Sequence, residues 1–181
     1  IEAAFPDRLA TPTFACPDSF LQGLPAEALH EAGRTRSPAL AWIPRRDDLP
    51  RLLKWLDLRG EGAELGVFEG HFARHFLQHS QLSVYHLVDY WGGSEGAANL
   101  HWTEEHLRKY KGRYRVHKML TMEAVKQFRD GQLDYLYIDA THTYNSVRSE
   151  LLAYYPKGKG GGIIAGPDWD SWVGADAVEG V

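Results

Sequence analysis

Short apolar runs alternate with amphipathic segments along the chain from about Gly62 onward. The apolar runs predict buried strands at 63–68, 82–91, 114–120, 133–140 and 161–166. The intervening segments repeat apolar residues three and four positions apart, which predicts helices at 70–80, 103–112, 121–131 and 144–155. Strands that alternate with helices of about ten residues indicate βαβ units. The pattern therefore predicts an α/β fold whose parallel sheet is covered on both faces.

The first 50 residues follow no such alternation. Seven of the nine prolines lie there, and proline interrupts both helices and ladders because it lacks a backbone N–H. We expect loops with one short helix near 25–32, so that 1–50 form an N-terminal extension or cap and 51–181 form the core. Another helix is predicted within 47–58, where Pro50 suits a first turn and leucines follow at helical spacing.

Composition and charge narrow the function classes. A chain of 181 residues suits one domain with a sizeable core. The formal net charge of −4 comes from mixed charges without a basic block, so we expect no nucleic-acid partner. The only cysteine, Cys16, excludes an internal disulfide framework and favours a reducing compartment such as the cytoplasm. No apolar run approaches the roughly 18–20 residues that span a bilayer.

The first candidate site is the turn that follows the strand at 63–68. Glu64, Gly66 and Gly70 form the pattern E-x-G-x-x-x-G. Glycine permits positive φ and close backbone approach, and free N–H groups at the next helix start suit an anion. The spacing differs from G-x-G-x-x-G, so it does not specify a dinucleotide. A tight turn with a solvated acid is the alternative interpretation.

Asp89 is the second candidate, because it ends the next predicted strand. Acids at this place in dinucleotide folds accept hydrogen bonds from a ribose diol. Asp89 lies 19 positions after Gly70, near the interval of about 20 found in such folds. Alone it is an ordinary polar strand end. Together with the glycine turn, it predicts a ligand that contains a nucleoside.

Two further acids follow the last two predicted strands. Asp139 ends the strand at 133–140, and His142 comes three residues later. A carboxylate and an imidazole at a strand mouth suit a hard metal ion and proton transfer. Asp168, with Asp170, could face Asp139 and complete a Mg²⁺ site. The alternatives are that Asp139 caps the next helix, that His142 is a surface histidine and that Asp168 belongs to a turn.

The order of these motifs resembles one family. The segments "ELGVFEG" (64–70), "IDATH" (138–142) and "GGIIAGPDW" (161–169) are similar to motifs of class I S-adenosylmethionine-dependent methyltransferases. They resemble most the branch of small-molecule O-methyltransferases, over about 52–168. The resemblance implies a Rossmann-like, doubly wound parallel sheet. It also implies a sixth and a seventh strand, whereas the sequence stops at Val181, shortly after the fifth, so we expect a C-terminally incomplete core.

The resemblance implies roles for individual residues. Those implied to bind the cofactor, S-adenosylmethionine, are Glu64, Gly66, Phe68, Gly70, Asp89, Thr121, Met122 and Asp139. The residues of the first motif would surround the methionine part, Asp89 would hold the ribose hydroxyls, and Thr121 and Met122 would lie near the adenine. Asp139 and Asp168 match positions that bind a divalent metal. His142 takes the place of the general base and would act with Asp139 in catalysis.

Three functional interpretations remain open from the sequence. The leading one is a methyltransferase that acts on a hydroxyl of a small molecule, with Mg²⁺ in the metal-dependent version. Pro167 stands where metal-dependent relatives often carry a ligand, which weakens that version. The second is a silent methyltransferase-like module in a larger assembly, with a protein partner or self-association covering the sheet edge. A nucleotide-dependent oxidoreductase is third, since the last glycine of G-x-G-x-x-G is absent. A lid is expected at 91–102.

Overall fold

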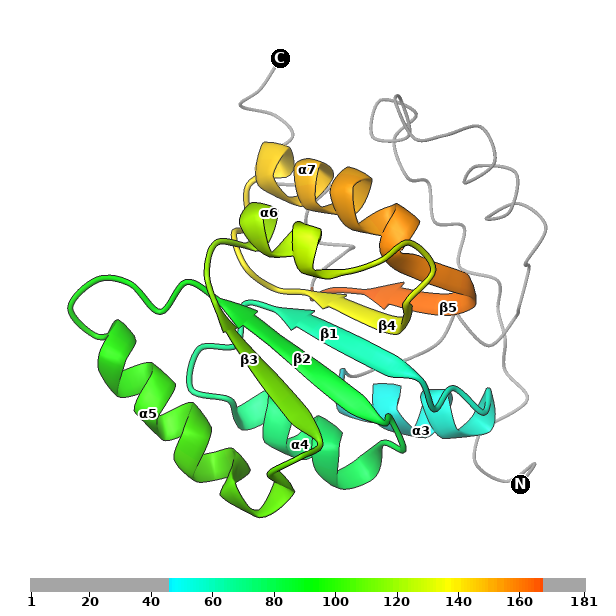
Figure 1. Cartoon of the computed structure of the whole chain (residues 1–181), viewed down its shortest axis with the longest axis horizontal. Helices are drawn as coiled ribbons and strands as arrows, with labels where there is room; N and C mark the ends of the chain where they lie inside the picture. The colour runs from blue at the N-terminus through cyan, green and yellow to red at the C-terminus, as the bar shows by residue number, and fades with distance from the viewer. Residues whose placement is uncertain (1–45, 168–181) are drawn as a thin grey trace. The chain divides into compact units, whose positions relative to one another are not determined.

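The computed structural model describes residues 46–167, which contain one parallel sheet (Figure 1). Its strands are β1 (Glu61–Leu65), β2 (Val84–Asp89), β3 (Tyr114–Lys118), β4 (Leu133–Ile138) and β5 (Gly158–Ala165). They are ordered β3-β2-β1-β4-β5, and every neighbouring pair is parallel. The predicted α/β class and the doubly wound parallel sheet are thus confirmed. The expected helix near 25–32, Cys16, Asp168 and Asp170 lie outside the described residues.

Helices cover both faces of the sheet. The α-helices are α3 (Leu49–Trp55), α4 (His71–His79), α5 (Gly96–Leu107), α6 (Thr121–Ala124) and α7 (Tyr144–Tyr154), and the 3₁₀ turns are η3 (Arg46–Asp48), η4 (Arg108–Tyr110), η5 (Val125–Gln127) and η6 (Tyr155–Lys157). Figure 1 shows α3, α4 and α5 on one face, and α6 and α7 on the other. Within 46–167, no helix is long and apolar enough to cross a membrane.

The face under α4 is built on aromatic rings. The ring of Phe76 lies between Tyr85 and Tyr135, with centroids 4.7 and 4.5 Å away. These tyrosines are the β2 and β4 partners of Gly62, so the strand between them carries no side chain there. Phe72, one turn before Phe76, contacts Tyr137 at 4.6 Å. The i, i+4 spacing recognised in the sequence thus places α4 directly on the sheet.

The opposite face carries the second half of the core. Phe128 and Tyr154 pack with buried residues from three strands, which are Ala63, Leu65, Val88, Leu133, Leu136 and Ile138. Ala124 of α6 is fully buried in the same cluster. Because β1 and β4 bury side chains on both faces, they appear in the sequence as continuous apolar runs.

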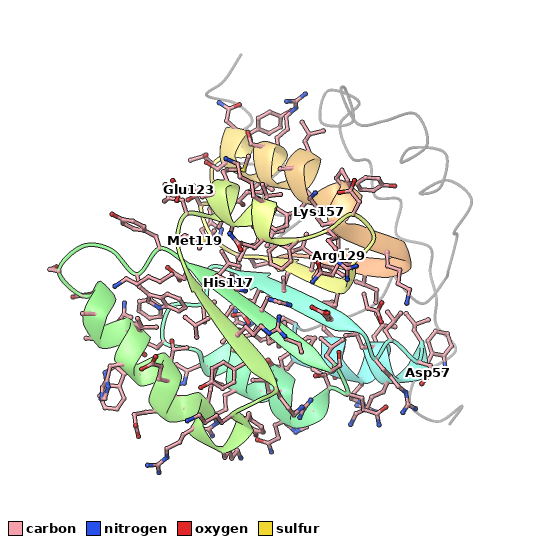
Figure 2. All side chains as sticks on the ribbon, in the orientation of Figure 1. Asp57, His117, Met119, Glu123, Arg129 and Lys157 are labelled. Carbon is pink, nitrogen blue, oxygen red and sulfur yellow. The ribbon has the colours of Figure 1, made fainter. Side chains whose placement is uncertain are left out.

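A polar row crosses this second face, in which His86 is buried and Glu61, Gln132 and His117 are partly exposed. His86 Nε2 lies 2.7 Å from Glu61 Oε2. His86 Nδ1 lies 2.9 Å from Nε2 of His117 on β3, which is labelled in Figure 2. Gln132 donates to the same Glu61 oxygen at 2.8 Å. Burial lowers the pKa of both histidines below the ordinary value. Burial thus favours neutral imidazoles, which can donate from one ring nitrogen and accept at the other.

The strand order reverses next to β1. The chain runs outward through β2 and β3 on one side, then returns to place β4 and β5 on the other. The N–H of Asp139 donates to the carbonyl of Leu65 at 2.8 Å, which joins the carboxyl ends of β1 and β4. Ligands of doubly wound sheets bind at such a switch point.

Several element boundaries differ from the predictions. β1 ends at Leu65 because Gly66 turns the chain with φ +86°, so 66–68 are not strand. α5 begins at Gly96 rather than Thr103, so residues 96–102 of the expected lid at 91–102 are helix. The helix predicted for 121–131 is confined to α6 and η5, since Phe128 adopts an extended backbone to enter the core.

Candidate functional site

Gly66 brings two strand ends into contact. A Cβ atom at this position would lie 2.1 Å from the carbonyl oxygen of Asp139 and 2.7 Å from Cα of Ala140. Its φ of +86° also lies in the region that favours glycine. Gly66 therefore allows the loops after β1 and β4 to touch at the switch point. In the Cβ direction, the space is filled by protein atoms.

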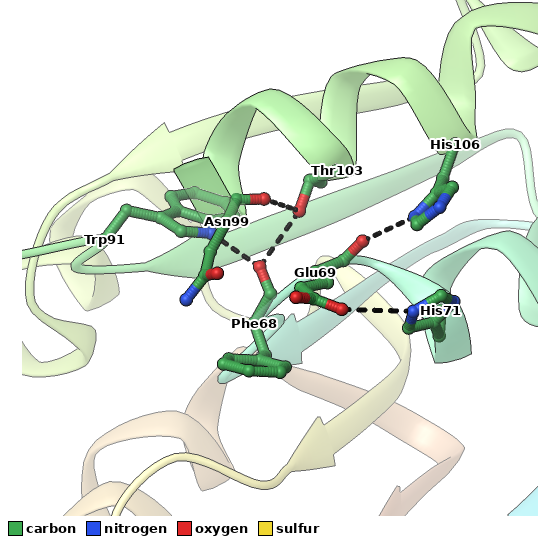
Figure 3. Close-up of polar contacts among 7 residues, drawn as sticks. All are labelled: Phe68, Glu69, His71, Trp91, Asn99, Thr103 and His106. Carbon is green, nitrogen blue, oxygen red and sulfur yellow. Dashed lines mark hydrogen bonds and ion pairs between the residues drawn. The ribbon is translucent and has the colours of Figure 1, made fainter. Parts of the chain in front are cut away.

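Phe68 has a left-handed backbone and an exposed ring. Its φ is +55°, and the residue is 61% exposed. The N–H donates to Asp89 Oδ2 at 2.9 Å. The carbonyl accepts from Trp91 Nε1 at 2.8 Å and from Thr103 Oγ1 at 3.0 Å (Figure 3). A non-glycine residue keeps such a conformation only where its surroundings enforce it, and such sites are often functional.

Asp89 lies at the carboxyl end of β2, where the sequence analysis placed it. Its Oδ2 accepts the N–H groups of Val67 and Phe68 at 2.8 and 2.9 Å, and its Oδ1 accepts that of Trp91 at 2.9 Å. The carboxylate thus fixes the turn after β1 to the end of β2. This clamping role was not predicted; the role toward a ribose stays a prediction.

α5 holds the second half of the turn. Gly70 has φ +76°, and a Cβ there would lie 3.0 Å from Cγ2 of Thr103. His106, three residues further along α5, contacts the carbonyl oxygen of Glu69 at 2.8 Å (Figure 3). The side chain of Glu69 meets His71 at 3.2 Å. Thr103 and His106 were missed because the turn residues that they contact lie 35 and 37 positions away in the sequence.

Glu64 is buried beneath this turn and is 2% exposed. It pairs with Tyr137 across β1 and β4 and faces the aromatic side of the sheet. Burial raises the pKa of Tyr85 well above its ordinary value, and the neighbouring Glu64 carboxylate raises it further. The predicted contact of Glu64 with the methionine part of a cofactor is untested.

Asp139 and His142 come together after β4, as predicted. Asp139 Oδ1 lies 3.6 Å from His142 Nε2, an ion-pair distance that is longer than a hydrogen bond. The His142 side chain is 56% exposed, whereas that of Asp139 is 22% exposed. Among residues 46–167, no group of three acids, histidines or cysteines is arranged to hold a metal ion. The described residues alone therefore do not form the expected Mg²⁺ site.

Thr121 and Met122 begin α6 at the carboxyl end of β3. The Thr121 hydroxyl donates to Glu150 Oε1 at 2.5 Å, and its carbonyl accepts from the Tyr154 hydroxyl at 2.7 Å. Burial raises the pKa of Glu150, partly offset by the Thr121 hydrogen bond and by His142. Glu150 was missed because, in sequence, it is one acid in an amphipathic helix.

Exposed apolar side chains gather at the same edge of the sheet. They follow β1, β2 and β3 and comprise Phe68, Tyr90, Leu120 and Met122, each 45 to 61% exposed. Large apolar side chains left in water commonly mark a binding surface. Together with the acids at the strand ends, they form an edge suited to a ligand with both aromatic and polar parts.

Solved structures share the fold at low sequence identity. One, a caffeoyl-CoA O-methyltransferase-like protein from Staphylococcus aureus, is 18% identical with a TM-score of 0.55, over 83% of this chain and 69% of that one. A protein from Corynebacterium glutamicum is 11% identical with a TM-score of 0.55, over 77% and 67%. The cofactor-bound protein Rv0187 from MTB is 18% identical with a TM-score of 0.52, over 84% and 66%. This chain thus spans about two thirds of their lengths.

The sequence itself matches one family model. No curated protein matches the chain significantly. The methyltransferase domain model, however, matches residues 63–169, which is more than half of the chain. The match begins in β1 and includes the turn at Gly66, Asp89, Asp139 and His142. The chain therefore belongs to the S-adenosylmethionine-dependent methyltransferases of class I.

Proposed function

We propose that the protein transfers a methyl group from S-adenosylmethionine to a hydroxyl of a small molecule. The family supports the cofactor. The hydroxyl acceptor rests on the pair of Asp139 and His142, 3.6 Å apart at the switch point of the sheet. A carboxylate beside an imidazole is an arrangement that removes a proton near neutral pH.

In the proposed reaction, the protein aligns the acceptor with the methyl group and removes the proton of the acceptor hydroxyl. The bound cofactor would supply an electrophilic methyl group. Nε2 of His142 is the ring nitrogen that faces Asp139 at 3.6 Å, so Nδ1 would be the nitrogen that accepts the hydroxyl proton. The acceptor oxygen would form the new bond to the methyl carbon as the sulfur–carbon bond of the cofactor breaks. Holding the reacting atoms in line supplies much of the rate enhancement in such a displacement. No step runs through a metal.

The clamped turn at Phe68 supports the binding step. Its backbone is held at three polar contacts before any ligand arrives. A preformed turn loses less conformational entropy on binding than a loop that must be ordered. The gathered apolar side chains at the same edge would cover the adenosine.

Calorimetry tests the proposal. Titration with S-adenosylmethionine and with S-adenosylhomocysteine should give micromolar dissociation constants. His142→Ala should keep this binding and lose methyl transfer to small phenols and catechols, measured as S-adenosylhomocysteine formation and product mass. Absence of heat with both cofactor forms would rule the proposal out. Methyl transfer that survives in His142→Ala would reject the base assignment alone.

A silent methyltransferase-like module is the second candidate. One observation favours it: three backbone N–H groups already occupy the oxygens of Asp89. A carboxylate has about four acceptor positions, so these contacts restrict what remains for a ribose diol. Failure of the wild-type protein to bind either cofactor form would support this module.

A further inference from the structure

Glu150 is a buried carboxyl at the candidate site that none of the sequence motifs contains. It lies on α7 and is 3% exposed. Its Oε1 accepts the hydroxyl hydrogen of Thr121, whereas its Oε2 is buried without a hydrogen-bond partner in the described part of the chain. A buried polar atom left unpaired costs free energy and needs an explanation.

Tyr154 adds a second contact from the same helix face. It follows Glu150 by one turn of α7, and its hydroxyl donates to the carbonyl of Thr121 at 2.7 Å. α7 thus holds Thr121 both by its side chain and by its backbone. Glu150 and Tyr154 stand 29 and 33 residues away from Thr121 in sequence.

Thr121 needs such support because α6 is too short to be stable without tertiary contacts. The helix has four residues, and its N-cap, Leu120, makes no side-chain cap hydrogen bond. Helices of this length are unstable without tertiary contacts. The position of Thr121 and of the exposed Met122 at the end of β3 therefore depends on α7.

Glu150 also interacts electrostatically with His142, the proposed base. This interaction lowers the pKa of Glu150, against the larger effect of burial, which raises it. If Glu150 only filled space in the core, an apolar side chain of similar volume would do so without the free-energy cost of burying a carboxyl group.

We propose that Glu150 is a positioning residue of the cofactor site, which holds the Thr121–Met122 turn, with Tyr154, in the place that receives the adenine. This inference rests on the proposed function and names residues beyond it. Glu150 does not touch the ligand. It acts through the hydroxyl of Thr121, whose orientation it determines.

Two matched pairs of variants test the inference by titration with S-adenosylhomocysteine. Glu150→Leu removes the acceptor, and Glu150→Gln keeps an oxygen for Thr121. Thr121→Val removes the donor, and Thr121→Ser keeps it. We expect Glu150→Leu and Thr121→Val each to weaken binding about tenfold, equivalent to about 1.4 kcal/mol. Glu150→Gln and Thr121→Ser should keep most of the wild-type affinity. The double variant Glu150→Leu/Thr121→Val should bind no more weakly than the worse single one, because both remove one interaction.

Asp134→Asn controls for lost stability. Asp134 is likewise buried, but it lies near the amino end of β4, where it accepts from the Gly60 N–H at 2.6 Å. The Asp134→Asn variant should have a lower unfolding temperature than the wild type. Its dissociation constant for S-adenosylhomocysteine, measured well below that temperature, should stay within twofold of the wild-type value. If the wild type binds and Glu150→Leu binds within twofold of it, the inference is wrong although the proposed function stands. If the wild type does not bind, both are wrong.

Discussion

The indole Nε1–H of Trp91 donates to the carbonyl oxygen of Phe68 across 2.8 Å. This bond ties the end of β2 to the strained turn after β1, and both residues have positive φ, +41° and +55°. The turn is therefore held from outside by a neighbour 23 positions later in the sequence. Its conformation is a property of the assembled sheet edge rather than of the E-x-G-x-x-x-G motif.

Trp91→Phe should loosen the turn and keep an aromatic ring. A lost neutral hydrogen bond costs about 1 kcal/mol of unfolding free energy, and Thr103 still donates to the same carbonyl. We expect about 1–2 kcal/mol of lost stability by urea unfolding and a several-fold weaker S-adenosylhomocysteine affinity by calorimetry. Trp102→Phe is the control, since Trp102 is half exposed on α5. Equal affinity of the two variants would contradict the role of the bond.

Asp89→Ala should damage stability as well as binding. The substitution leaves three backbone N–H groups without their acceptor. Since the site is partly exposed and water can replace part of the loss, we expect about 2 kcal/mol. The unfolding free energy of Asp89→Asn, which keeps one acceptor oxygen, should lie between those of the wild type and Asp89→Ala. If Asp89→Ala unfolded at the same urea concentration as the wild type, the contacts of Asp89 would contribute nothing to stability.

Gly66→Ala should be far more harmful than its backbone angle alone predicts. The new Cβ would lie 2.1 Å from the Asp139 carbonyl oxygen, in addition to the positive φ. Gly112 provides the matched control, with φ +95° and no atom within 4 Å of a Cβ. We expect Gly112→Ala to cost about 1 kcal/mol of unfolding free energy. Gly66→Ala should cost at least about 3 kcal/mol or prevent folding. Similar unfolding temperatures would refute the steric argument.

The row of His86 and His117 predicts sensitivity to acid. Burial lowers the pKa of both imidazoles in the folded protein, whereas in the unfolded chain they titrate near about 6.5. Below that pH the unfolded chain binds more protons, so the unfolding free energy should fall as pH drops from about 7 toward 5. Glu61 and His117 contact His86 directly. The charge of Arg115 lowers the pKa of His86 further, whereas the Glu61 carboxylate raises it and so offsets part of the effect.

Urea unfolding between pH 5 and pH 8 measures this dependence. His117→Gln removes one of the titrating groups and should flatten the slope of unfolding free energy against pH. His101→Gln, on the exposed surface of α5, should retain the wild-type slope. Identical slopes for the wild type and His117→Gln would overturn the assignment.

Sequence patterns predicted those helices whose apolar residues are regularly spaced along one face. α4 and α7 were predicted within one or two residues because their apolar spacing fits one helix face. α5 was not, since Gly96 starts it with a close approach to the Trp91 backbone, a contact that no local pattern records. α6 was overextended because the chain leaves the helix to bury Phe128.

The candidate site divides in the same way. Asp89 and Asp139 were found because a polar residue that ends an apolar strand is visible in one dimension. Thr103 and Glu150 were missed because their partners, Phe68 and Thr121, lie 35 and 29 positions away. Helix residues that contact a distant turn carry no signal at their own position.

By itself, the sequence determined the parallel sheet, the order of its motifs and the placement of acids at the strand ends. The alternation of strand and helix periods dictates these features locally. Only the tertiary structure decided which atoms fill the positions beside Gly66 and Gly70, and which groups use the oxygens of Asp89. These depend on how close two loops or a loop and a helix approach after the sheet has assembled. Packing between segments distant in sequence determines that distance.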